Sequence, residues 1–210
     1  MVLPFLLALL LGFKHSYDPD HILAVSNFLS KTKSLSAAIK MSIYWTAGHM
    51  LTASIVTLIL FQFRNYIISY LLGYFEYIVA LTLIILGIFS LVSLKFSHIH
   101  KHEHRKKQHV HIYTHEKHYH KHMFGIGVIQ GLASNDELLT LFVVSLTITT
   151  LTGILLGVFL FSLGVAAGML LYSVGLNYMS KFGGSRMRAI ITLVSGIFSI
   201  GYGILMLSGF

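Results

Sequence analysis

Residues 12–22 read Gly12-Phe13-Lys14-His15-Ser16-Tyr17-Asp18-Pro19-Asp20-His21-Ile22, in the middle of an apolar run that covers residues 2–29. Pro19 cannot donate a backbone hydrogen bond to the carbonyl of His15, and the residue before a proline is pushed away from helical geometry. We therefore predict that a helix in this run opens at Pro19. An apolar run of this length is expected to span a membrane. Ionisable groups inside a membrane cost about 2.5–3.5 kcal/mol each, so the cluster of His15, Asp18, Asp20 and His21 indicates a functional site.

The composition predicts a protein with many membrane spans. The chain has 210 residues, of which 55% are hydrophobic and only 10% are charged. A soluble globular domain carries about 25% charged residues, so an ordinary soluble enzyme is excluded and the lipid bilayer is the expected surrounding. There is no cysteine, which excludes disulfides and every site that needs a thiolate.

Apolar runs of sufficient length predict an all-α membrane protein with six transmembrane helices. A faint similarity between the segments that start at His15 and at Gln130, and between Trp45–His49 and Phe161–Val165, predicts a 3+3 inverted repeat with broken helices near the midplane. The expected halves are residues 1–97 and 123–210, separated by a loop at 98–122. The six expected spans are 2–29, 41–63, 66–94, 123–151, 153–179 and 188–208.

The distribution of basic residues predicts the orientation. Nearly all Lys and Arg residues fall in the first, third and fifth loops. The positive-inside rule then makes these loops cytoplasmic and places both termini outside a prokaryotic plasma membrane. Because the basic residues are spread over three loops that flank the membrane, we do not expect nucleic acid as a partner.

Further polar residues lie near the centres of two other expected spans. His49 lies near the centre of 41–63, and Asn135, Asp136 and Glu137 lie near the centre of 123–151. Imidazole nitrogens with carboxylate oxygens form a ligand set for nickel, cobalt, zinc, iron or manganese, whereas magnesium and calcium prefer oxygen ligands alone. A straight helix favours Asp18 as the ligand between His15 and His21, and a helix opened at Pro19 favours Asp20; the sequence leaves both open.

The expected cytoplasmic loop at 98–122 is rich in histidine. Its composition is typical of a flexible segment, and the repeated His-x-His spacing suits metal chelation, so we interpret the loop as a metal buffer or sensor. A basic surface that contacts lipid headgroups is the alternative. The ten histidines are His98, His100, His102, His104, His109, His111, His115, His118, His120 and His122.

At these residues the chain resembles the nickel/cobalt transporter family of secondary metal permeases. The family signature H-x4-D-H, preceded by Gly-hydrophobic-basic, is matched by residues 12–21, and a second motif resembles Gly48-His49. A third motif is partly matched by Gly131, Ser134 and Glu137, and residues 164–169 are similar to the small-residue helix of the family. The resemblance implies that Ni²⁺ or Co²⁺ is bound by His15, Asp20, His21 and His49. From their positions in the expected spans, Asp18, Asn135 and Glu137 are further candidate ligands.

The sequence thus predicts a secondary transporter that takes up Ni²⁺ or Co²⁺ as its substrate, without a cofactor. The resemblance extends to nickel/cobalt resistance exporters, so proton-coupled efflux of these or other divalent metals (zinc, iron or manganese) is the alternative; Asp20 favours the permease branch. A metal-dependent membrane enzyme and a membrane metal sensor are alternatives of a different class. We do not expect an enzyme, and a cytoplasmic metallochaperone is a candidate partner.

Overall fold

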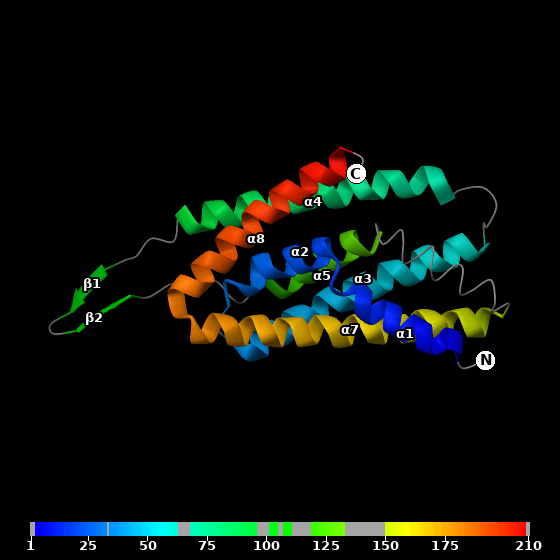
Figure 1. Cartoon of the computed structure of the whole chain (residues 1–210), viewed down its shortest axis with the longest axis horizontal. Coiled ribbons are helices and arrows are strands. Elements are labelled where there is room, and N and C mark those ends of the chain that lie inside the picture. Colours follow the sequence, from blue (N-terminus) through cyan, green and yellow to red (C-terminus); the bar gives the residue numbers. More distant parts are fainter. Residues whose placement is uncertain are drawn as a thin grey trace.

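The chain folds into a bundle of helices with one short hairpin (Figure 1). The computed structural model describes residues 3–32, 34–62, 68–95, 101–104, 107–110, 119–132 and 150–208. The helices are α1 (Leu3–His15), α2 (Pro19–Leu29), α3 (Leu35–Gln62), α4 (Ile68–Lys95), α5 (Tyr119–Leu132), α7 (Leu151–Phe182) and α8 (Gly184–Leu207).

The first apolar run forms two helices because the chain breaks before Pro19. Pro19 is the first residue of α2, and Asp18 before it has extended backbone angles (φ −65°, ψ 144°). The carbonyl of His15, to which a proline cannot donate, accepts instead from the backbone N–H of Asp18 at 3.0 Å. The predicted break is confirmed.

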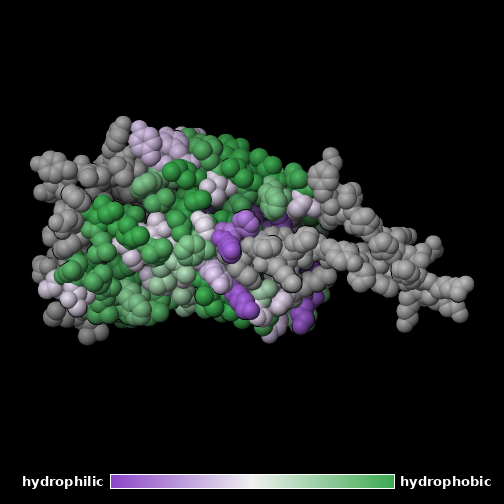
Figure 2. All heavy atoms as spheres, turned by 180° about the vertical axis from the view of Figure 1, so that it is seen from behind, coloured by the Kyte–Doolittle hydropathy of each residue, from purple (hydrophilic) through white to green (hydrophobic). Residues whose placement is uncertain are grey.

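Long apolar helices make up most of the described chain. Three of them are long and apolar enough to cross a membrane by length and composition: Tyr74–Leu94 within α4, Leu151–Phe182 and Gly184–Leu207. Many of their leucine, isoleucine and phenylalanine side chains are exposed, as on Phe198, which is 62% exposed. Figure 2 shows an apolar surface over most of one face of the molecule. Such a surface is typical of a helical protein that lies among lipid tails.

The predicted histidine-rich loop contains regular structure that the sequence analysis did not anticipate. Strands β1 (Lys101–His104) and β2 (Lys107–Val110) form an antiparallel hairpin in which His102 pairs with His109. Helix α5 begins at Tyr119, within the expected loop, and the described part of the expected span 123–151 is helical as far as Leu132. The described residues are therefore helical, as predicted, apart from one small two-stranded sheet within the expected loop.

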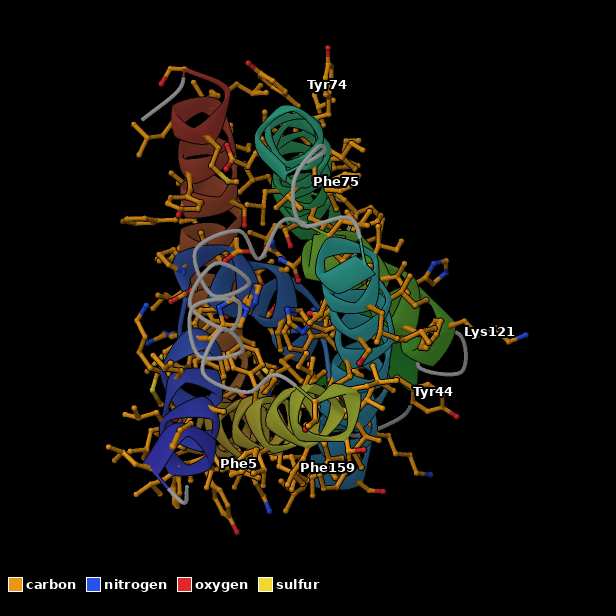
Figure 3. The ribbon with its side chains drawn as sticks, turned by 90° about the vertical axis from the view of Figure 1, so that its right-hand side faces the viewer. Phe5, Tyr44, Tyr74, Phe75, Lys121 and Phe159 are labelled. Carbon is orange, nitrogen blue, oxygen red and sulfur yellow. The ribbon has the colours of Figure 1, made fainter. Side chains whose placement is uncertain are left out.

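Three pairs of helices pack closely along their length: α1 with α7, α3 with α5, and α4 with α8. Helix α2 lies in the interior, where it contacts α3, α4, α5, α7 and α8. Figure 3, which looks along the bundle, shows Tyr74 and Lys121 pointing away from it. The interior position of α2 brings its first turn, with His21, against the middle of α3.

Candidate metal centre

Three buried histidines meet at the break between α1 and α2. His15 ends α1, His21 lies in the first turn of α2, and His49 lies in the middle of α3. Their side chains are only 1–2% exposed. The interruption at Pro19 allows this meeting, because it turns the chain between His15 and His21 and starts a new helix toward the interior.

The distances between the imidazoles match those of ligands around one metal ion. His15 Nε2 lies 2.9 Å from His21 Nε2 and 3.3 Å from His49 Nε2. One ligand atom from each ring lies within 4.8 Å of the other two. Two nitrogens bound to one ion at about 2.05 Å are about 2.9 Å apart at a right angle and about 3.3 Å apart at the tetrahedral angle. The two distances from His15 Nε2 therefore fit a shared ion, and all three rings offer a ligand atom within 4.8 Å of the others.

The carboxylates of Asp18 and Asp20 lie behind the imidazoles, on their Nδ1 sides. Asp18 Oδ2 lies 2.9 Å from His15 Nδ1 and accepts a hydrogen bond from it. Asp20 Oδ2 lies 2.8 Å from His21 Nδ1, a close contact in which the two groups are not aligned for a hydrogen bond. Both carboxylates favour a proton on Nδ1, which leaves the Nε2 lone pair free for a metal; partners of this kind orient metal-binding histidines in many proteins.

The sequence left open whether Asp18 or Asp20 lies between the two histidines as a ligand. The structure places each of them beside one histidine instead. Asp18 and Asp20 approach the outer nitrogen of one histidine each, and within the described residues the group of candidate ligand atoms contains the three histidines alone. Asn135, Asp136 and Glu137 lie outside the described residues, as do several histidines of the expected loop. Asp18 and Asp20 thus lie where groups that orient a metal-binding histidine commonly lie, and their role stays a prediction.

An aromatic wall closes one side of the cluster. The indole of Trp45 stacks on the ring of His49, with 5.1 Å between centroids and 27° between planes. It also meets His21 edge-on, with 4.9 Å between centroids. Trp45 is fully buried and donates from Nε1 to Gln130 Oε1 at 2.6 Å. Sequence reasoning aligned Trp45 and Gln130 with the other half of the chain but assigned neither of them a role.

Glycines place the helices that carry the histidines. A Cβ atom on Gly12 would lie 1.9 Å from the carbonyl oxygen of Phe161, and one on Gly127 would lie 2.0 Å from the carbonyl oxygen of Trp45. Because these distances are far below contact, α1 and α5 each touch the backbone of a neighbouring helix, and only glycine permits it. His15 lies one turn after Gly12, so this contact fixes its position.

Comparison with known proteins finds one relative of similar length. The chain is 29% identical over 205 residues to the urease accessory protein UreH of Bacillus sp. (strain TB-90), over 94% of this chain and 87% of that protein. No protein-family model matches the chain, and no solved structure matches it significantly. The relative is named as an accessory protein, which agrees with the expectation that the chain is not an enzyme.

Proposed function

We propose that this protein is a secondary transporter that moves a divalent transition-metal ion across the plasma membrane, with Ni²⁺ or Co²⁺ as the substrate. The convergence of three imidazole Nε2 atoms in a buried cluster, with carboxylates at the outer nitrogens of His15 and His21, carries the proposal. Nε2 atoms 2.9–3.3 Å apart are held together either by a proton shared between them or by a cation that they bind in common. Imidazole suits nickel and cobalt, and a relative named as a urease accessory protein favours a nickel-related function.

Equivalent glycine contacts in the two halves support the 3+3 inverted repeat. Gly127 lies 115 residues after Gly12, and Phe161 lies 116 residues after Trp45. A Cβ on Gly12 would lie 1.9 Å from the oxygen of Phe161, and a Cβ on Gly127 would lie 2.0 Å from the oxygen of Trp45. The two contacts are therefore the same contact with the halves exchanged, as a two-fold axis requires.

Helices α4 and α8 make two glycine contacts with each other that are also equivalent under exchange of the halves. A Cβ on Gly87 would lie 2.6 Å from the oxygen of Gly196, and one on Gly203 would lie 2.7 Å from the oxygen of Ala80. Gly203 and Gly196 each lie 116 residues after their counterparts, Gly87 and Ala80. Six spans in two inverted halves are the arrangement we infer from these contacts.

The charges support a single cytoplasmic end. In Figure 1 the ends of α2, α4 and α7 and the beginnings of α3, α5 and α8 lie at the end of the bundle from which the hairpin projects. Basic residues lie at these helix ends, whereas α1 and α7 begin at the opposite end without one. On the positive-inside rule, we assign the hairpin end to the cytoplasm and both termini to the outside. The basic residues at the cytoplasmic end are Lys31, Lys40, Lys95, Lys121, Lys181, Arg186 and Arg188.

Energetics favour uptake over export. A divalent cation that moves inward gains about 4.6 kcal/mol per 100 mV of membrane potential, because each elementary charge contributes about 2.3 kcal/mol. That drives accumulation of more than about a thousandfold without a coupling ion. Export has to overcome this gradient. We assign to the histidine-rich segment 98–122 the capture of the ion after entry, and delivery from it to a cytoplasmic metallochaperone.

Flux in liposomes tests the proposal. Purified protein in proteoliposomes is expected to admit Ni²⁺ or Co²⁺ when the interior is negative, and His21→Ala is expected to abolish the flux. His122, which is exposed on α5 outside the cluster, offers a matched control, and His122→Ala should transport normally. Undiminished flux in His21→Ala contradicts the site. Imposed pH gradients of both directions separate uptake from proton-coupled efflux, since only the latter accelerates when protons flow inward.

Binding gives a second and independent measurement. Trp45 is the only tryptophan of the chain and its ring lies 5.1 Å from that of His49. Ni²⁺ or Co²⁺ at the three histidines should therefore quench the tryptophan emission in a saturable way. Quenching that persists in His21→Ala with an unchanged midpoint would place the ion elsewhere.

A further inference from the structure

A buried amide on α5 connects this helix to α3 and α2 beside the cluster. Gln130 on α5 is 1% exposed. Its Oε1 accepts a hydrogen bond from Trp45 Nε1 on α3 at 2.6 Å, and its Nε2 donates to the backbone carbonyl of Asp20 on α2 at 2.8 Å. Since the indole nitrogen is only a donor and the carbonyl only an acceptor, the amide has one orientation that satisfies both. Its two contacts therefore lock α3 and α2 in one relative position.

Both hydrogen bonds of Gln130 are made to groups that adjoin the proposed metal-binding histidines. The carbonyl of Asp20 belongs to the peptide that precedes His21, so its position sets where the backbone of His21 lies. The indole of Trp45 stacks on His49 and meets His21 edge-on, so its position limits the rotation of both rings. Through these two hydrogen bonds Gln130 fixes the surroundings of two of the three imidazoles.

The inferred internal repeat relates Gln130 to one of the three histidines. Gln130 lies 115 residues after His15 and occupies the equivalent place in the second half. Where the first half supplies an imidazole, the second supplies an amide that holds the site together. An amide oxygen that accepts from an indole and an amide nitrogen that donates to a carbonyl hold α3 and α2 together, which is a structural task.

We propose that Gln130 is a positioning residue, which sets the geometry of His21 and His49 around the transported ion through Trp45 and the Asp20 carbonyl. The proposal rests on the proposed function, because it takes the three histidines as the metal site. Groups that orient metal ligands typically affect metal affinity by about 10–100-fold when they are replaced.

The test compares full-length variants in detergent, with NiCl₂ titrated by calorimetry and CoCl₂ followed by visible absorption. Gln130→Leu keeps the volume and removes both hydrogen bonds; we expect the Kd for Ni²⁺ to rise by about 10–100-fold. The Co²⁺ absorption should also change in intensity, because that intensity depends on coordination geometry. Asn177→Leu is the matched control: it replaces an amide that is 4% exposed on α7 and bonds to none of the site residues, and both readouts should stay as in the wild type.

A double-mutant cycle separates positioning from general destabilisation. Trp45→Phe keeps a ring against His49 and removes the N–H that binds Gln130. If Gln130 acts through Trp45, the loss in Gln130→Leu combined with Trp45→Phe should be smaller than the product of the single losses. If Gln130→Leu does not fold, Trp45→Phe alone should still raise the Kd severalfold.

The outcomes are distinct. A wild-type Kd and a wild-type Co²⁺ spectrum in Gln130→Leu would overturn the positioning role while leaving the proposed function intact. Equal losses in Gln130→Leu and Asn177→Leu would also overturn it, because any buried amide would then serve. A wild-type protein that binds neither ion would instead overturn the proposed function on which this inference rests.

Discussion

The close contact of α1 with α7 allows the metal site to be disturbed without touching a ligand. A Cβ on Gly164 of α7 would lie 2.1 Å from the carbonyl oxygen of Leu9 and 2.7 Å from the backbone nitrogen of Phe13. Ordinary contact of a Cβ begins at 3.4 Å. The substitution Gly164→Ala therefore has to push the backbone of α1 away by about 1.3 Å, since neither obstructing atom belongs to a movable side chain.

This displacement is large on the scale of a metal site. His15 follows Phe13 by two residues and ends α1, so it moves with the helix, while His21 and His49 lie on α2 and α3. Metal–ligand distances are held within about 0.2 Å, so a shift of about 1.3 Å removes His15 from the ion. We expect the Kd for Ni²⁺ to rise by at least about 10–100-fold, and the strain of the added methyl group to cost about 1–3 kcal/mol of stability.

Quenching of the Trp45 emission by Ni²⁺ measures the affinity, and thermal denaturation in detergent measures the stability. Gly157→Ala supplies the matched control, because Gly157 is a buried glycine on the same helix and a Cβ there would meet no atom within 4 Å. The control should bind as the wild type does. A folded Gly164→Ala protein with the wild-type Kd would refute the reasoning, since it would show either that α1 does not move or that His15 is not a ligand.

Three further predictions concern charges and the histidine-rich segment. Asp18→Asn removes the negative charge at His15 Nδ1 and should weaken Ni²⁺ binding by about 10–100-fold in calorimetry; unchanged binding would deny the carboxylate an orienting role. Burial against Phe89 lowers the pKa of Lys31 to about 8 from 10.5, so the unfolded chain binds more protons between these values. Stability should therefore rise with pH from about 8 to 10.5 and this rise should vanish in Lys31→Met; a rise that persists would point to another group. Deletion of residues 98–122 should leave Ni²⁺ flux in liposomes intact but reduce the metal retained by cells, and loss of flux would favour the sensor interpretation.

Local chemistry in the sequence was enough to predict the break, whereas the ligands on either side of it stay a prediction. Pro19 acts on its own neighbours, so the opening of the helix follows from one residue. The positions of the two carboxylates relative to the histidines could not be predicted. An imidazole has two nitrogens, and only the folded chain shows which of them faces Asp18 or Asp20. The choice between these two acids as ligand therefore stays a prediction.

Sequence patterns did not predict the interactions between helices that are far apart in the chain. Trp45 and Gln130 are 85 residues apart, and their hydrogen bond depends on the register in which α3 packs on α5. That register is set by glycines such as Gly127, whose spacing indicates close packing but not the partner helix. The hairpin of β1 and β2 was missed for a different reason, since a tract of histidine and lysine carries no alternation of apolar and polar residues.

The site lies between two tightly packed units, and this placement bears on how an ion would be released. His15 belongs to α1, which is held against α7 by Gly12 and Gly164, whereas His49 belongs to α3, which is held against α5 by Gly127. Backbone contacts as close as these resist sliding, so each pair should move as one body. A rocking of one pair against the other then changes the separation of His15 Nε2 and His49 Nε2, now 3.3 Å, more than any distance within a pair. The ion would be bound when the pairs are together and lose a ligand when they part, which is what alternating access requires of a site built between two bodies that move.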